Sequence, residues 1–411
     1  MIYLFIFIYL LFLSIHYDIL ENRKYKWTHY KIVITLLVLV VGLRWRVGAD
    51  TVFYVQDFTS CHDLFHLEWG DFESVRRMPL WVLLNALCKT IWDDFLLVQF
   101  IIAAFTLGVI AYFIKNLCPS LCFFVLLCYF ISVKFTLMHM DLLRESVAVG
   151  FYLLAILSFN KKRITLSLIY VIVAIMFHVF ASIAVLFFIF YHYFLPRDYV
   201  GRFFVCFALL MLTILNNDFL TSVLVSSLGG YDTDGEALLI VLDYASSDKH
   251  GNVDKTIINY IWLVIQFSAY LYMLYKCEKV YSKYILLNED VFNTLIFVSV
   301  SILCLKYSVS IFYRIGENYN YFITCILSVM FTKDVLIGKV IKIQRVFVFL
   351  IFLLIPLSIS FKQYIFKEPQ FDNRWYSRYY PYSSVFNKFI DPSREKQHQL
   401  RGGGYSEEDN Y

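Results

Sequence analysis

Apolar runs of about 15–20 residues follow one another along most of the chain, and a helix of that length crosses the hydrocarbon core of a bilayer. Hydrophobic residues reach 60% and charged residues only 17%, where soluble domains average roughly 45–50% and about 25%. The first run, MIYLFIFIYLLFLSIH, has neither a basic start nor a small-residue cleavage site, so it is expected to remain as a helix. The sequence therefore excludes a soluble enzyme and predicts an all-α polytopic integral membrane protein.

The apolar runs predict about 12 transmembrane helices, within a range of about 11 to 13. The expected spans are 1–16, 31–45, 95–114, 118–136, 145–160, 164–178, 179–195, 201–217, 256–275, 291–312, 319–333 and 343–361. The stretch 79–92 is also apolar, but it is short and is interrupted by Asn85 and Lys89. It is therefore expected to be re-entrant or interfacial rather than a full crossing.

Basic residues orient this bundle, because Lys and Arg concentrate in cytoplasmic loops. An N-terminus on the outside places most of them, including the turn Lys161-Lys162-Arg163, on the inner side. A full crossing by 79–92 would move that turn to the outside, which favours the non-spanning interpretation. The long loops 46–94 and 218–255 are then expected on the outer side of the membrane.

The chain is expected to divide into a bundle, residues 1–361, and a C-terminal tail, residues 362–411. The tail is rich in Tyr and carries eight Lys or Arg, and this basic character argues against an outer location under the charge rule. The last eleven residues, RGGGYSEEDNY, are polar and glycine-rich, and they are expected to be disordered.

Four arginines lie at the predicted outer ends of spans, where the charge rule disfavours cations. They are Arg44, Arg46, Arg144 and Arg314. An anionic ligand on the outer side explains this placement, and pyrophosphate is a good candidate because guanidinium groups bind phosphate oxygens through two parallel hydrogen bonds. The alternative for any single arginine is that it extends to the phosphates of lipid headgroups.

Five motifs resemble, in order, those of EpsG-type exopolysaccharide polymerases, which are relatives of the Wzy O-antigen polymerases. The stretch Arg46–Tyr54 (RVGADTVFY) resembles the R-x-G-x-D-x-x-x-Y signature, and Arg144–Ala148 resembles an R-x-x-x-A helix start. A basic turn, an apolar helix and then Phe177–Ser182 resemble the F-H-x-x-A/S motif. Arg314 followed by Tyr319 and Tyr321, and finally Pro381-Tyr382, resemble the late Arg/Tyr and PY elements.

The resemblance implies a helical bundle of the GT-C type in the bacterial cytoplasmic membrane. It implies polymerisation of undecaprenyl-diphosphate-linked oligosaccharide repeat units into a surface polysaccharide at the outer face. The implied partners are these lipid-linked glycans, the bilayer, a chain-length regulator and a flippase; no nucleic acid and no cofactor are expected. Ala49 stands where the family often has Thr, which leaves the sugar specificity open.

Within this reaction, the arginines would bind the pyrophosphate groups and a general base would take the proton of the attacking hydroxyl. Asp50 and His178 are the two outer-facing candidates for the base. Asp50 has the alternative of orienting Arg46 through a local ion pair, and His178 that of a neutral hydrogen-bonding role. Tyr54, Tyr319 and Tyr382 are the candidates for contact with sugar rings.

No metal is expected in the site. His62 and His66 are four residues apart and would share a helix face, with Glu68 nearby, but two histidines without a firm third ligand are a frequent coincidence.

Two other functions remain as alternatives. A lipid-linked oligosaccharide flippase or other transporter fits the hydropathy equally, and Lys306 inside a predicted span favours it, although no internal repeat is evident. A ligase or acetyltransferase acting on surface glycans would also use outer arginines and a histidine.

Overall fold

The computed structural model describes residues 1–72, 78–194, 198–215, 260–261, 263–268, 272, 284–305, 311–329, 342–368 and 373–400. The expected outer loop 218–255, Lys306 and the last eleven residues lie outside the described residues. Helices dominate the described chain, as the sequence predicts. The small exception is an antiparallel pairing of β1 (Lys367–Glu368) with β2 (Asn373–Arg374).

The chain divides into two compact units. The first comprises Met1–Leu154, Ile172–His178 and Leu327–Tyr411, and the second comprises Ala155–Val171 and Val179–Ile326. The first unit contains α1 (Ile2–Leu13), η1 (Ser14–Ile19), α2 (Lys26–Gly42), α3 (Thr51–Ser60), η2 (Trp69–Asp71), α4 (Pro79–Ile91), α5 (Phe95–Leu117), η3 (Pro119–Leu121), α6 (Cys122–Ile131), α7 (Val133–Thr136), η4 (Leu137–Asp141), α17 (Lys342–Ile365), η8 (Trp375–Arg378) and α18 (Pro392–Leu400). The second contains α10 (Phe180–Tyr193), α11 (Tyr199–Leu215), α15 (Glu289–Leu305) and most of α16 (Ile311–Val329), while α8 (Leu143–Asn160) and α9 (Ile164–Phe177) contribute to both.

Three described helices are long and apolar enough to cross a membrane: Ile2–Ile19, Phe95–Leu117 and Leu143–Asn160. A bent pair, Pro119–Ile131 with Val133–Asp141, raises the number to four if it forms one span. The chain is thus a membrane protein by its apolar helices, and the larger number of spans stays a prediction.

The helix expected over 118–136 is broken at Ser132, and its two parts are bent by 78°. Ser132 has an extended backbone (φ −69°, ψ 142°), and its hydroxyl accepts a hydrogen bond from the backbone N–H of Lys134 at 3.2 Å. Serine stabilises a helix N-terminus in this way. The apolar composition that predicts one span therefore hides the start of a new helix near the C-terminal end of this span.

The antiparallel pair α2 and α5 shows where the segment between them lies. At the start of α5, the buried Gln99 donates from Nε2 to the carbonyls of Gly42 (2.8 Å) and Arg44 (2.9 Å). At the other end, the Lys115 ammonium lies 4.7 Å from the ring centre of Trp27. The chain therefore leaves α2 and enters α5 at the same end, and residues 43–94 add no net crossing.

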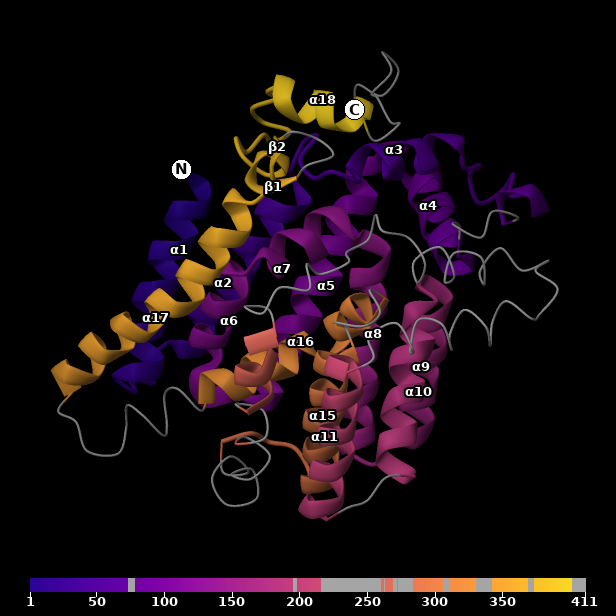
Figure 1. The fold of residues 1–411 in the computed structure, drawn as a ribbon. Coiled ribbons are helices and arrows are strands. Elements are labelled where there is room, and N and C mark those ends of the chain that lie inside the picture. The colour runs from indigo at the N-terminus through magenta and orange to yellow at the C-terminus, as the bar shows by residue number, and fades with distance from the viewer. Residues whose placement is uncertain are drawn as a thin grey trace. The chain divides into compact units, whose positions relative to one another are not determined.

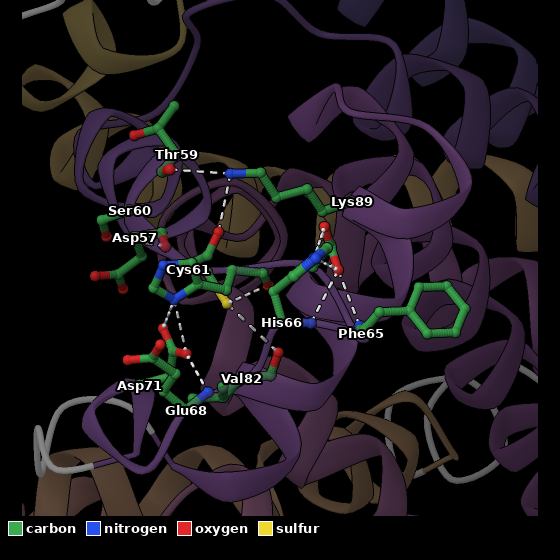
Figure 2. A network of polar contacts seen from close by, with 12 residues as sticks. Asp57, Thr59, Ser60, Cys61, Phe65, His66, Glu68, Asp71, Val82 and Lys89 are labelled. Carbon is green, nitrogen blue, oxygen red and sulfur yellow. Dashed lines mark hydrogen bonds and ion pairs between the residues drawn. The ribbon is translucent and has the colours of Figure 1, made fainter.

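Lys89, which interrupts the apolar stretch 79–92, ties α4 to α3 (Figure 2). Its ammonium donates to three carbonyls at the end of α3, those of Phe58 (3.2 Å), Thr59 (2.9 Å) and Cys61 (2.9 Å). The last carbonyls of a helix have no partner within it, and a cation also suits the negative end of the helix dipole. The lysine thus explains why α4 packs on α3.

In the second unit, α10 packs against α15 and α16. The Tyr191 ring meets Phe297 of α15 edge-on at 4.9 Å, and the Tyr319 hydroxyl of α16 donates to the carbonyl of Ala184 at 2.6 Å.

Candidate functional site

The loop between α2 and α3 carries the R-x-G-x-D motif, and Arg44 holds it from within. Its fully buried guanidinium donates to the carbonyls of Val47 (3.1 Å), Val41 (2.6 Å) and Met140 (3.3 Å). Arg44 was expected among the pyrophosphate ligands, and in the structure its side chain is 0% exposed. In this arrangement Arg44 holds the loop through backbone carbonyls.

The motif glycine, Gly48, lies where a side chain does not fit. Its φ is +106°, and an added Cβ would lie 2.4 Å from the Met140 carbonyl oxygen and 3.0 Å from Asp141 Oδ1. Glycine adopts positive φ without steric cost. It therefore allows the loop to approach η4 closely, and this approach is what places the residues on either side of it.

Asp141, the last residue of η4, connects three parts of the first unit. Its side chain is buried at 1% exposure. Oδ1 accepts a hydrogen bond from the Ala49 backbone N–H at 2.7 Å, and Oδ2 accepts one from the Tyr379 hydroxyl at 2.5 Å. The Arg378 guanidinium lies 3.4 Å from the same Oδ2. Buried carboxylates need such donors, and these come from the loop and the tail.

The tail lies along the loop as an extra strand-like segment. The backbone N–H of Trp45 donates to the carbonyl of Ser383, and that of Val385 donates to the carbonyl of Leu43, each at 3.0 Å. Arg44 and Ser384 therefore form an antiparallel bridge. In Figure 1 the yellow tail elements lie at the same end of the unit as the N-terminus and α3, and the Tyr3 hydroxyl donates to the Tyr379 carbonyl at 3.3 Å.

The helix α18 contacts the motif arginine, Arg46, through Arg394 and Glu395. The buried Arg394 donates from Nη1 to the Arg46 carbonyl (2.9 Å) and from Nη2 to the Pro381 carbonyl (2.5 Å). Arg46 itself has φ +51°, and its guanidinium lies 4.8 Å from the Trp45 ring centre and 3.7 Å from Glu395 Oε1. Burial raises the pKa of Glu395, and the nearby Arg46 opposes this shift. The motif arginine is thus held against an aromatic face beside a carboxylate.

Arg144, the second residue of α8, lies over an aromatic ring of the loop helix. Its guanidinium is 5.8 Å from the ring centre of Tyr54, which is buried and meets the Trp81 ring edge-on at 5.3 Å. Within the described residues no hydrogen bond or ion pair engages Arg144, and its buried Nε has no acceptor. A guanidinium in this state is held by the aromatic ring, and its donors suit an anionic ligand.

The remaining candidates on the loop and the tail are Asp50 and Tyr382. Asp50 is the N-cap residue of α3, but its carboxylate does not cap the helix. The Tyr382 hydroxyl donates to the Val40 carbonyl at 2.9 Å, and its ring meets Tyr3 edge-on at 5.7 Å. Arg46, Asp50, Tyr54, Arg144 and Tyr382 therefore belong to one region of the first unit.

Aromatic contacts describe the surroundings of His178 and Arg314. His178 follows α9, and the preceding Phe177 stacks on Phe151, which lies about 10 Å further along α8 than Arg144. Arg314 lies in the second unit, with its guanidinium 5.7 Å from the Phe180 ring centre. Tyr319 is buried there, and its hydroxyl is engaged by a carbonyl. Arg46 and Arg144 thus belong to the first unit and Arg314 to the second.

The two histidines between α3 and α4 take separate carboxylate partners. His62 Nδ1 lies 3.0 Å from Asp71 Oδ2, and His66 Nδ1 lies 2.8 Å from Asp63 Oδ2. The pKa of Asp63 is lowered, chiefly by the hydrogen bond from His66. Among the described residues, no group of three His, Cys, Asp or Glu is arranged to hold a metal ion.

A comparison with family models decides the family. The model described as the EpsG family matches residues 27–384. The chain belongs to the EpsG family. The expected resemblance is thereby confirmed, and the EpsG family associates the chain with polysaccharide biosynthesis and glycosyltransferase-like polymerase activity. No curated protein and no solved structure matches the chain.

Three residues that organise this EpsG-family site were not predicted from the sequence: Asp141, Arg378 and Arg394. Asp141 had a local signal. It is a carboxylate at the edge of an apolar run, three residues before Arg144, and burying such a group costs free energy unless it has partners. For the two tail arginines, the only sequence signal was the basic composition of the tail. The charge rule does not assign such a basic segment to the outer side.

Proposed function

We propose that this EpsG-family protein polymerises undecaprenyl-diphosphate-linked oligosaccharide repeat units into a surface polysaccharide, at the outer face of the bacterial cytoplasmic membrane. The full bundle would have about 12 spans of the GT-C type. The observation that carries the proposal is Arg144. Its guanidinium lies over Tyr54, and no acceptor among the described residues engages it, which leaves its donors available to a ligand.

The reaction places negative charge where such arginines act. A terminal sugar hydroxyl of one lipid-linked unit attacks the anomeric carbon of the growing chain. The new carbon–oxygen bond forms as the bond to the diphosphate breaks, and undecaprenyl diphosphate leaves. Arg46, Arg144 and Arg314 bind the diphosphates and stabilise the charge that develops on the leaving oxygen.

The proton of the attacking hydroxyl needs an acceptor. Asp50 is the first candidate, because it ends the R-x-G-x-D motif directly before α3. His178 remains the second candidate. Its neighbour Phe177 packs on Phe151, which lies nearer to the C-terminal end of α8 than Arg144 does. Tyr54, Tyr319 and Tyr382 would shape the sugar-binding surface mainly as framework residues.

One observation favours a flippase as a second candidate. The break at Ser132, with its 78° bend, resembles the interrupted helices that line transport pathways. A flippase would move single lipid-linked units and would make no glycosidic bond, so the length of the glycan product distinguishes the two.

Substitution of the arginines tests the proposed polymerase activity. Lysine keeps the charge but loses the planar pair of donors, so Arg144→Lys and Arg314→Lys should each lower polymer formation by about 10²–10³-fold. Protein abundance and single-unit product should stay normal. The measurement is the ladder of glycan lengths in cells complemented with each variant.

Arg163→Lys is the matched control, because Arg163 is exposed in the basic turn at the other end of α8; it should give a wild-type ladder. Wild-type ladders from both Arg144→Lys and Arg314→Lys at normal expression would refute the proposal.

A further inference from the structure

Asp141 stands between the two motif arginines of the first unit. It ends η4 three residues before Arg144, and its Oδ1 accepts the backbone N–H of Ala49, which is adjacent to Asp50. The neighbouring Met140 carbonyl accepts hydrogen bonds from Arg44 Nη2 at 3.3 Å and from Thr51 Oγ1 at 3.4 Å. One short segment, 140–141, therefore receives both ends of the R-x-G-x-D loop.

The other oxygen of Asp141 is bound by the tail. The Tyr379 hydroxyl donates to Oδ2 at 2.5 Å and Arg378 lies 3.4 Å away. The Arg378 carbonyl in turn accepts from the Gly48 N–H at 3.0 Å. Loop, η4 and tail thus form a closed ring of hydrogen bonds, and removal of the tail donors leaves a buried charge with fewer partners.

We propose that Asp141 is the positioning residue of the site: its carboxylate fixes the loop 46–50 relative to Arg144, and it does so only when Arg378 and Tyr379 of the tail are docked on it. The inference rests on the proposed function only for its catalytic consequence. A misplacement of about 1 Å at a reacting group costs up to about 100-fold in rate, so a network that holds the spacing of two arginines controls activity without touching substrate.

The first test is structural and does not depend on the reaction. The full-length protein in lipid nanodiscs is followed by amide hydrogen exchange, which reports local opening. We expect Asp141→Asn and Tyr379→Phe to accelerate exchange in residues 46–50, with α5 unchanged. Tyr376→Phe is the matched control, because Tyr376 lies in η8, which ends directly before Tyr379, and is 41% exposed; this change should leave exchange unchanged.

The second test is kinetic. With a purified lipid-linked repeat unit, Tyr379→Phe should lower kcat/KM by about tenfold, within the range expected for misplaced groups. The double variant Asp141→Asn with Tyr379→Phe should be no worse than Asp141→Asn alone, because both changes remove the same interaction. Additive losses would show that Tyr379 acts elsewhere.

The two tests separate the two proposals. Faster exchange at 46–50 in the two variants, together with a wild-type protein that makes no polymer, would refute the proposed function and leave the positioning role intact. Unchanged exchange in both Asp141→Asn and Tyr379→Phe would refute the positioning role, whatever the activity. Because Tyr379→Phe retains the carboxylate and Arg378, it tests the idea even if Asp141→Asn fails to fold.

Discussion

Gly48 illustrates how a motif residue serves the geometry rather than the chemistry. Its positive φ and the 2.4 Å approach of the Met140 oxygen to an added Cβ leave no room for a side chain. Strain at such a position costs about 1–3 kcal/mol, and the collision adds a similar amount.

Gly48→Ala should therefore destabilise the protein and abolish the polymer ladder by displacing the loop. Thermal unfolding and the ladder assay measure the two effects. Gly70→Ala is the control, because an added Cβ there meets nothing within 4 Å and should be tolerated. A wild-type ladder from Gly48→Ala would show that the close approach of the loop to η4 is dispensable.

The sequence predicted the residues of the loop better than their roles. Arg46, Asp50 and Arg144 were identified from span ends and spacing, and the structure places all three in one region of the first unit. Arg44 shares the same local signals, yet its donors are used by backbone carbonyls. Only the three-dimensional course of the loop shows which arginines bind backbone carbonyls of the protein and which have donors available for an anion.

At the scale of elements, Lys89 links two helices that hydropathy alone does not relate. Its three hydrogen bonds to the end of α3 hold α4 in place, and hydrogen bonds from a charged donor each stabilise by about 1.5–3 kcal/mol.

Lys89→Met should loosen α3 by removing these donors while keeping the apolar stem. We expect faster amide exchange in residues 51–60 and little change in α5. Lys115→Met, at an exposed site on α5, should not affect α3. Equal protection of α3 in wild type and Lys89→Met would contradict the capping role.

Element boundaries were predictable where apolar runs end in polar residues, as for α5 and α8. They were not predictable where a break occurs inside an apolar run, as at Ser132, because a single hydroxyl that caps the next helix hardly changes the hydropathy. The tail was missed for a different reason. Its pairing with the loop joins residues more than 300 positions apart, such as Arg394 with Arg46, and no local pattern encodes that contact.

At the scale of the whole molecule, the structure makes the tail and the loop share one side of the membrane. In a cysteine-free background, an impermeant thiol reagent should label Ser60→Cys and Phe386→Cys in intact cells and should leave Lys162→Cys unlabelled. All three positions are exposed, and the charge rule assigns the basic turn to the cytoplasm.

Labelling of position 162 without labelling of position 60 would contradict the predicted orientation and indicate the opposite one. Labelling of position 60 without position 386 in intact cells would contradict the docked tail. Permeabilised cells serve as the control for reactivity at each position.

The large sequence separation between the loop and the tail has a consequence for the folding of the newly synthesised chain. Residues 43–50 leave the ribosome early, whereas Arg378, Tyr379 and Arg394 follow only after the intervening helices have been inserted. Contacts between such distant parts form late in folding, since the loop that they close is long. Newly inserted chains would therefore hold an unfinished loop at the membrane surface, and the arginine site would mature only after the tail has been translocated.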